Sequence, residues 1–378
     1  MKTAGYILLA ILLLRLIISI INYLWKLKTN FFFRPIGVRP PFGKMGVRPR
    51  LSWSILVPVR NEEGNIGNLL GDIERLDVMP DEVIIFDDNS LDNTLRVVES
   101  FGDRLTNLKV IRSSSETLPM GWLGKNNACY QLANAAKGEY LLFLDADVRV
   151  GNGIAENYIR YAQKKSVSLL SVFPLQILPG YQSKISTPIM NWILLSLLPL
   201  PLVEFSSFSS FAAANGQFML FKADRYKVLQ PHRVFRNSKA EDIEICRYYK
   251  RKGEKTTTLT GDKSVRCLMY NNLEEAINGF SKNVFYFFGN SVALTILFLF
   301  ITTLTPLYLF IFNGLLYGLG SILAIIVIRI MTSATGEQSL IDNIRYLPVQ
   351  HNVFIRIIMR ALRNRREREQ IWKGRNIY

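Results

Sequence analysis

The chain has 378 residues, a formal net charge of +16 and an apolar fraction of 49%. This length allows one sizeable domain with appendages, and the apolar fraction is high for a soluble enzyme, so membrane segments are sought first. Three cysteines occur, at spacings unlike those of zinc sites or disulfide frameworks, which fits a reducing compartment.

The first expected element is a transmembrane anchor over residues 1–28. Residues 7–24 are almost wholly Leu and Ile, and at about 1.5 Å per residue they can cross a hydrocarbon core of roughly 30 Å. Arg15 lies near the middle and costs roughly 2.5–3.5 kcal/mol, whereas the Leu and Ile residues favour insertion by roughly 4–8 kcal/mol. A cleaved signal peptide is disfavoured, because the run is too long and no small-residue cleavage site follows it.

The positive charge lies in two blocks, a basic juxtamembrane linker expected over residues 29–50 and a basic amphipathic tail over 336–378. Residues 26–50 hold seven Lys or Arg and no acid, and residues 345–375 hold nine against two acids. By the positive-inside rule both blocks face the cytoplasm, which two later crossings satisfy. Anionic lipid is favoured over nucleic acid as their partner, because no aromatic-interleaved basic module is present.

An α/β domain is expected over residues 51–285. Strands are predicted over residues 53–59, 83–86, 108–112 and 140–144, and helices over 65–76, 94–101 and 126–136. Strands that alternate with helices imply βαβ units and a Rossmann-like, mainly parallel sheet. The loops that follow the strands should then meet along one crevice at the carboxyl edge of the sheet.

Acidic pairs end two of these strands. Asp145 and Asp147 follow the run 140–144, and Asp87-Asp88 follows 83–86. Two carboxylates spaced two apart offer hard oxygen ligands for Mg²⁺ or Mn²⁺ and leave coordination positions for a diphosphate. We expect Asp147 to bind the metal directly and Asp145 to reach the ribose or a metal-bound water.

Asp88 is assigned to the nucleoside, because a carboxylate can accept hydrogen bonds from uracil and from ribose hydroxyls. The alternative is that residues 87–90 simply cap the next helix, where Asp, Asn and Ser are favoured. One aspartate of the pair can cap while the other binds.

The segment over residues 185–203 is apolar but carries Pro188, Pro199 and Pro201. Because proline breaks helix interiors, an interfacial or re-entrant segment is favoured over a spanning one. The aromatic stretch over 205–211 that follows is either an entry for an apolar acceptor or packed core, and the sequence leaves both open.

A transmembrane hairpin is expected over residues 286–335. Two apolar runs, over 292–312 and 315–331, are separated by Asn313-Gly314, a turn-forming dipeptide.

Four motifs together carry a resemblance to a known family. Residues 54–63, the turn over 87–90, Asp145-Ala146-Asp147 and Glu241-Asp242 resemble, in order and approximate spacing, the signature of family 2 glycosyltransferases. The resemblance implies a GT-A fold, with a nucleotide-binding half over residues 51–150 and an acceptor half over 151–285. It also implies inverting transfer of a sugar from a nucleotide donor, usually a UDP-sugar.

Further pieces are similar to one membrane-anchored branch of that family, which includes carotenoid-acid (diaponeurosporenoate) glucosyltransferases and hopene-associated glycosyltransferases. These pieces are residues 121–125, 215–217, 266–270 and 372–375 with Tyr378.

The resemblance also implies a set of site residues. Those expected to bind the nucleotide-sugar are Pro58, Arg60, Glu62, Asp88, Lys125, Asp145, Gly216, Gln217 and Glu241. Arg60 is otherwise an ordinary surface charge. For Lys125, a donor to the phosphate or sugar and an exposed lysine in the first turn of a helix are equally open.

Inverting transfer needs a general base near the nucleophilic oxygen of the acceptor, and Asp242 is the candidate. Alternatively, Glu241-Asp242 begins a helix over 243–250, where acids favour the positive end of the dipole. Both can hold. If the acceptor is a carboxylic acid, Asp242 chiefly orients it.

Processive polysaccharide synthases of this family often carry Gln-x-x-Arg-Trp, and here residues 279–283 contain no Arg-Trp. This favours a single transfer to a small acceptor. We therefore expect a metal-assisted transfer of glucose from a UDP-sugar to a lipid such as a carotenoid acid, by a multi-pass protein of the cell membrane with a cytoplasmic catalytic domain. The alternatives are a polyprenyl-phosphate sugar transferase, a surface-polysaccharide glycosyltransferase, and a non-catalytic nucleotide-binding scaffold.

Overall fold

The computed structural model describes residues 1–33, 52–114, 117–270, 272–368, 371–373 and 375–376. Most of the predicted linker over 29–50 and the end of the motif that closes on Tyr378 lie outside these residues. The chain forms two compact units, here called the α/β unit and the helical unit. The α/β unit comprises residues 26–175 and 202–267, and the helical unit comprises residues 1–25, 176–201 and 268–378.

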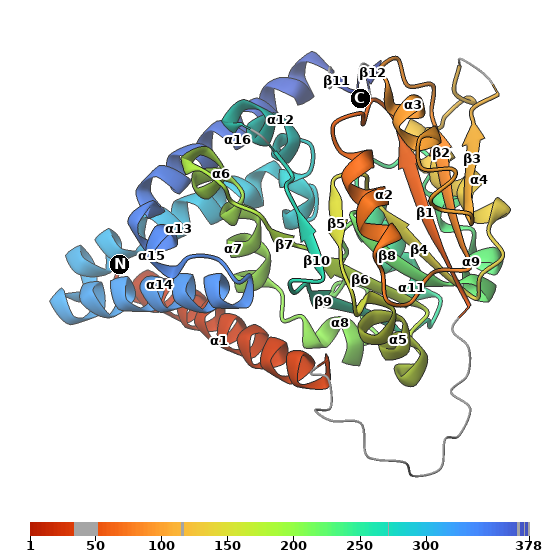
Figure 1. Ribbon diagram of the computed structural model, residues 1–378. Coiled ribbons are helices and arrows are strands. Elements are labelled where there is room, and N and C mark those ends of the chain that lie inside the picture. The colour runs from red at the N-terminus through yellow and green to blue at the C-terminus, as the bar shows by residue number, and fades with distance from the viewer. Residues whose placement is uncertain (34–51, 115–116, 271, 369–370, 374, 377–378) are drawn as a thin grey trace, which may run out of the picture. The chain divides into compact units, whose positions relative to one another are not determined.

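The α/β unit is built on a seven-stranded sheet in the order β3-β2-β1-β4-β8-β6-β9 (Figure 1). Its strands are β1 (Trp53–Val59), β2 (Glu82–Asp87), β3 (Leu108–Arg112), β4 (Tyr140–Leu144), β6 (Leu169–Phe173), β8 (Phe218–Lys222) and β9 (Thr256–Thr260). All neighbouring pairs are parallel except those of β8 with β4 and with β6. The expected mainly parallel α/β sheet is therefore confirmed.

Helices join the strands of the first half as the alternation predicted. They are α2 (Ile66–Glu74), α3 (Thr94–Glu99) and α4 (Gly124–Ala135), and the second half adds a π-helical turn (Ala155–Ile159), α5 (Arg160–Lys165), α8 (Pro201–Phe205), α9 (Ala223–Leu229), α10 (Pro231–Val234) and α11 (Glu241–Arg251). Helix α4 begins two residues earlier than predicted, because Leu123 before it is extended and Gly124 already has helical geometry.

Strand β2 is longer than predicted at both ends, and Glu82 explains its start. The register places Glu82 opposite Ser54 of β1, and its buried carboxylate accepts a hydrogen bond from Ser54 Oγ at 2.8 Å. Lys109 Nζ adds a salt bridge of 2.7 Å, and the backbone amide of Lys137 donates to the same carboxylate. An acidic side chain with partners on both neighbouring strands can extend a buried strand, which sequence pattern alone does not show.

A short second sheet places residues beside the turn that follows β4. Strand β5 (Val148–Val150) pairs antiparallel with β10 (Val265–Cys267), with Cys267 opposite Val148. Cys267 is thereby brought next to Asp147. The remaining short strands are β7 (Leu175–Gln176) and, at the end of the chain, the pair β11 (Ile371–Trp372) and β12 (Arg375–Asn376).

Gly138, just before β4, lies against the backbone of β1, which gives a test of the sheet. A Cβ at this position would lie 2.7 Å from Ser54 N and 2.8 Å from Trp53 C. Gly138→Ala should therefore push two strands apart and destabilise the protein by about 2 kcal/mol, within the range for overpacking. Thermal unfolding measures this effect, and Gly64→Ala, where nothing lies within 4 Å of the new Cβ, is the control. Equal melting temperatures for the two variants would contradict the packing described.

The helical unit contains three helices long and apolar enough to cross a membrane, over residues 2–30, 292–313 and 315–335. They lie in α1 (Lys2–Phe33), α13 (Val292–Asn313) and α14 (Leu315–Thr335). Gly314 joins the last two at a φ of +106°, a conformation that favours glycine. The anchor helix and the hairpin helices are thus present as predicted, while the number of crossings and the side on which the α/β unit lies remain predictions.

The other helices of this unit are short, except for α16, which has 21 residues. They are α6 (Tyr181–Ser186), α7 (Pro188–Leu197), α12 (Leu273–Ser281), a 3₁₀ turn (Val284–Phe288), α15 (Leu340–Arg345) and α16 (Leu347–Glu367). Two of the three prolines of segment 185–203 stand at helix starts, since Pro188 opens α7 and Pro201 opens α8, whereas Pro199 lies between these helices. The start is the position that proline tolerates best in a helix.

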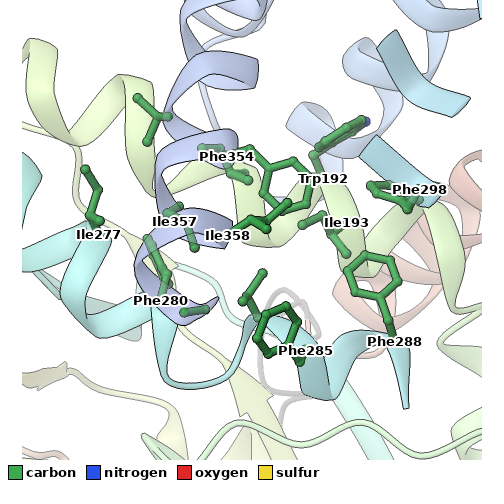
Figure 2. Packing of buried hydrophobic residues seen from close by; sticks show 14 of the residues in the cluster. Trp192, Ile193, Ile277, Phe280, Phe285, Phe288, Phe298, Phe354, Ile357 and Ile358 are labelled. Atoms are coloured by element: carbon green, nitrogen blue, oxygen red, sulfur yellow. The ribbon is translucent and has the colours of Figure 1, made fainter. Parts of the chain in front are cut away.

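An aromatic cluster fills the interior of the helical unit (Figure 2). It combines side chains of α7, α12, α13, α16 and the 3₁₀ turn, among them Trp192, Ile193, Phe280, Phe288, Phe298, Phe354 and Ile357. Helix α7 therefore packs its apolar side chains against the other helices of this unit. Whether the helix lies at a membrane interface, as predicted from the sequence, is not tested by this packing.

Candidate active site

A partly buried ion cluster joins three of the predicted site residues. Lys125, in the first turn of α4, places its Nζ 2.8 Å from Asp145 Oδ1 and 3.5 Å from Glu241 Oε1. Asp145 directly follows β4, and Glu241 is the first residue of α11. Lys125 is therefore not the exposed lysine that the sequence left open, since two carboxylates from distant elements hold it at the edge of the sheet.

Burial and charge act on these groups in opposite directions. Burial alone would lower the pKa of Lys125, but the charges of Asp145 and Glu241 outweigh it and raise that pKa well above its usual value. Burial raises the pKa of Glu241 to about 7, although Lys125 opposes the shift. The lysine stays protonated, so the cluster offers one fixed ammonium at the site.

Asp147 lies beside this cluster and is held by side chains from other strands. Its Oδ2 accepts a hydrogen bond from Gln217 Nε2 at 3.2 Å, and the same amide lies 2.8 Å from Cys267 Sγ. Burial first, then the charges of Asp145 and Glu62, raise the pKa of Asp147 to about 7. Other carboxylates nearby make the ionisation of Asp147 unfavourable, and a bound cation would offset this repulsion between negative charges.

Asp242 faces the loop over residues 215–217. Its Oδ2 accepts from the Gly216 amide at 3.0 Å, and its Oδ1 accepts from Ile243 N at 2.8 Å. Helix α11 begins at Glu241, two residues earlier than the predicted start at 243, because Glu241 and Asp242 already form its first turn. Asp242 thus lies in the first turn of a helix and can still serve as the candidate general base. Burial raises the pKa of its carboxyl.

Gly216 lies where this loop passes closest to the ion cluster. A Cβ on Gly216 would lie 3.0 Å from Lys125 Nζ and 3.4 Å from Glu241 Oε1. Its amide also serves Asp242. The small residue at this position thus allows the loop to approach both Lys125 and Asp242.

The loops after β1 and β2 are joined by Arg60. Its Nη1 donates to the carbonyl oxygens of Asp88 and Asn89, the latter at 3.0 Å. Because β1 and β2 are parallel neighbours, with Val59 opposite Asp87, both loops leave the sheet at one edge. Arg60 is thus not an ordinary surface charge.

The turn over residues 87–90 does not cap the next helix. Helix α3 begins at Thr94, and Asp92 accepts from Thr94 N at 3.0 Å. Within the turn, Asp87 Oδ1 accepts from Ser90 Oγ at 2.5 Å, while Asp88 is buried. Asp87 therefore holds the turn, and a nucleoside role for Asp88 stays a prediction.

Pro58 and Glu62 complete the predicted set. Pro58 lies within β1 opposite Phe86. Glu62 Oε2 accepts from Asn65 Nδ2 at 2.8 Å, and the charge of Glu62 contributes to the raised pKa of Asp147. The loop after β1 is thus electrostatically linked to the turn after β4, as expected for neighbouring parallel strands.

Within the part of the chain that the structure describes, no group of three or more His, Cys, Asp or Glu side chains forms a complete metal site. The residues nevertheless fit a divalent cation, because Asp145 and Asp147 are oxygen donors whose mutual repulsion raises the pKa of Asp147. Such a cation would take its remaining ligands from a diphosphate and water.

Three residues beside the site had no assigned role in the sequence. Asn215 Oδ1 accepts from Gln217 N at 2.9 Å, and Ser171 Oγ accepts from Asn215 N at 2.7 Å. Cys267 contacts the Gln217 amide. Asn215 and Cys267 belong to motifs that the family resemblance contained, whereas nothing in the sequence marked Ser171.

The raised pKa of Glu241 predicts a pH dependence of stability. A folded-state pKa of about 7, above the usual 4.5, means that the fold favours the protonated acid. Its contribution is complete below about pH 4.5 and is lost as the pH rises through 7, by on the order of 2 kcal/mol. Glu241→Gln, which resembles the protonated form, should flatten this decline in thermal unfolding between pH 4.5 and 8. Glu244→Gln on the same helix is the control, and an unchanged pH profile for Glu241→Gln would refute the assignment.

Comparison with known proteins now defines the class of this domain. Residues 54–187 match the model of glycosyl transferase family 2. This part of the chain, which contains β1 to β4 and both acidic turns, is therefore a domain of that family, and the predicted family resemblance is confirmed.

Among curated proteins, the chain is similar to 4,4'-diaponeurosporenoate glycosyltransferases. It is 26% identical over 243 residues to that of Staphylococcus haemolyticus (strain JCSC1435), which covers 62% of this chain and 61% of the relative. It is 38% identical over 128 residues to that of Staphylococcus aureus (strain bovine RF122 / ET3-1), covering 33% of this chain and 32% of the relative. The chain thus spans less than two thirds of the length of these relatives.

Among solved structures, the chain is similar to the mannosyltransferase PcManGT from Pyrobaculum calidifontis in complex with GDP-Man and Mn²⁺. The identity is 14%, the TM-score 0.48, and the match covers 94% of this chain and 99% of that one. S. aureus TarS in complex with UDP-GlcNAc matches with 16% identity and a TM-score of 0.40, covering 84% of this chain and 92% of that one.

Proposed function

We propose that the chain transfers a sugar, glucose in the first instance, from a UDP-sugar to a lipid acceptor that resides in the membrane, such as a carotenoid acid. The observation that carries the proposal is the gathering of Lys125, Asp145, Asp147, Glu241 and Asp242 in a unit that contains a glycosyl transferase family 2 domain. The curated relatives named after a carotenoid acid support the acceptor class.

On the donor side, the departing UDP leaves with negative charge on its diphosphate. Lys125 presents a permanently protonated ammonium to this charge, held in place by Asp145 and Glu241. Asp147, with Asp145, would hold Mg²⁺ or Mn²⁺, which when bound would act as a Lewis acid on the leaving group. Arg60 fixes the backbone of the loop after β2, next to which Asp88 would accept hydrogen bonds from the nucleoside.

On the acceptor side, Asp242 is the proposed general base. Its raised pKa favours proton uptake from an acceptor hydroxyl at neutral pH. Inversion requires the acceptor oxygen to approach the sugar opposite the diphosphate, and Asp242 would position that oxygen. With a carboxylic acid as acceptor no proton has to be removed, so that Asp242 would act by orienting the nucleophile.

An apolar acceptor dissolved in the bilayer suits an enzyme that is itself anchored there. The three apolar helices α1, α13 and α14 support a membrane association, and the basic segments flanking them support a multi-pass arrangement in the cell membrane with the α/β unit on the cytoplasmic side.

The direct test uses the full chain in detergent with radiolabelled UDP-glucose, Mn²⁺ and a C30 carotenoid acid, with products separated by thin-layer chromatography. A labelled glycosyl ester of the carotenoid acid is expected. If a product forms only with a polyprenyl phosphate, the acceptor is a polyprenyl phosphate and not a carotenoid acid. The proposal is overturned if no common UDP-sugar supports transfer to either acceptor and UDP does not protect the protein. The non-catalytic scaffold would then be the remaining alternative.

The metal assignment predicts a separate effect. Asp147→Ala should weaken UDP binding in the presence of Mn²⁺ by about tenfold or more, equivalent to ~1.4 kcal/mol, with little change in its absence. Isothermal titration with and without Mn²⁺ measures both affinities. Asp224→Ala, which removes a carboxylate from an ion pair with Lys222, is the control. If Asp147→Ala keeps the full Mn²⁺ dependence, another residue binds the metal.

A further inference from the structure

The helical unit buries two arginines. Arg15 of α1 is 4% exposed and Arg329 of α14 is 2% exposed. Both lie in helices long and apolar enough to cross a membrane. Charged side chains at such depth are rare and mark functional sites more often than structural ones.

Both guanidinium groups lie against the same aromatic ring. Arg329 Cζ is 4.0 Å from the centroid of Trp192, and Arg15 Cζ is 5.3 Å from it. Arg15 also lies 4.9 Å from the ring of Phe298. Trp192 and Phe298 belong to the aromatic cluster of Figure 2. Two like charges thus share one apolar environment, where their repulsion is screened far less than in water.

The hydrogen-bond partners of the two groups are neutral. Arg15 Nη2 donates to Ser196 Oγ at 2.9 Å, and Arg329 Nη1 donates to Gln350 Oε1 at 2.9 Å. Arg15 Nε and both Nε and Nη2 of Arg329 are buried without a partner among the described residues. Three buried donor nitrogens, which carry four N–H groups, therefore have no partner among the described residues.

No carboxylate of the described residues forms an ion pair with either arginine. Three acids of the helical unit instead pair with other cations, Glu274 with Arg356, Asp342 with Lys184 and Glu367 with Arg363. An arginine does not discharge under ordinary conditions. Among the described residues, the positive charge of this pair thus has no balancing carboxylate, and an anion bound from outside the chain would supply one.

We propose that Arg15 and Arg329 bind the oxyanion of an amphiphile, a carboxylate or a phosphate carried on an apolar chain. The planar fork of a guanidinium matches the two oxygens of such a group, and the surrounding Trp192 and Phe298 suit an apolar chain. The donors are enclosed by side chains, so the ligand reaches them when neighbouring side chains move aside. This site does not depend on the sugar transfer proposed above.

A purely structural role makes a different prediction. If Arg15 and Arg329 only fill space and hold Ser196 and Gln350, their loss should destabilise the protein equally with and without anions. If they bind an oxyanion, their loss should remove the stabilisation that the anion provides and leave the anion-free protein no less stable, because an uncompensated buried charge pair is removed with them.

The test uses the full chain, stripped of lipid in a neutral maltoside detergent, and three probes: palmitate, phosphatidylglycerol and inorganic phosphate. We expect the thermal unfolding midpoint of the wild type to rise by several degrees, in a saturable way, with palmitate, with phosphatidylglycerol or with both. Native mass spectrometry should then show one amphiphile bound per chain. Which of the two acts identifies the carboxylate or the phosphate as the ligand. The same effect from inorganic phosphate alone would overturn the assignment to an amphiphile.

The Arg15→Gln/Arg329→Gln variant should lose this shift and weaken binding at least tenfold. Arg345→Gln/Arg366→Gln, which removes the same charge from exposed positions of the same unit, should keep both. A full shift in the first variant overturns the proposal. If that variant does not fold, the wild-type protein still tests the proposal. The proposal is overturned if the wild type binds none of the three probes saturably.

Discussion

Replacing Asp242 by Asn should lower the turnover of sugar transfer to a hydroxyl acceptor by about 10²–10⁴-fold, the range for loss of a general base, while UDP affinity stays unchanged. The reason is geometric. An asparagine keeps the shape and can still accept one hydrogen bond from the Gly216 amide, which lies 3.0 Å from Asp242 Oδ2, but it cannot take up a proton. Initial rates with saturating donor, together with UDP titration, separate the two effects.

The control is Glu244→Gln, which removes an equal charge from the same first turn of α11 and should leave turnover near wild type. A carboxylic acid acceptor gives a second comparison. If Asp242 acts mainly as a base, its loss should matter much less for this acceptor than for a hydroxyl acceptor. Turnover of Asp242→Asn near wild type with both acceptors would remove Asp242 from the reaction.

The sequence predicted the framework of the site well, because the framework depends on local pattern. Strands β1 and β4 have the predicted bounds, since mainly apolar runs of five to seven residues between turn signals fit few other structures. The acidic turns follow from these strands, because parallel neighbours bring their carboxyl ends to one edge of the sheet. The position of Asp145 and Asp147 was thus predictable before any contact was known.

The contacts that tune the site were not predictable, because they join residues far apart in the chain. Nothing in the sequence pairs Lys125 with Glu241 or places Cys267 beside Gln217, and both contacts depend on how β8, β10 and α11 close around the turn. The arginine pair shows the same limit. Arg15 was visible as a charge in an apolar helix, but its shared ring with Arg329 depends on how three helices pack.

The second large effect is expected for Lys125→Met, which leaves Asp145 and Glu241 without their shared cation. Breaking a buried ion pair from one side costs 3–5 kcal/mol, and because Lys125 is 24% exposed we expect about 2 kcal/mol at pH 8. The loss should be smaller below pH 5, where the carboxyl of Glu241, with its pKa of about 7, is protonated and only the contact of Lys125 with Asp145 is still lost. Thermal unfolding at the two pH values measures this difference.

The double variant Lys125→Met/Glu241→Gln separates the structural from the functional role of Lys125. Removing the second charge should restore most of the stability at pH 8, since the two side chains are in contact and their effects should not add. The affinity for UDP-glucose should not recover, because the ammonium that would face the diphosphate is still absent, and we expect it to stay about tenfold weaker, or ~1.4 kcal/mol. Recovery of stability and affinity together would mean that Lys125 only supports the fold. Loss of affinity that persists in the stable double variant and is absent from Glu241→Gln alone would place the ammonium beside the donor phosphates.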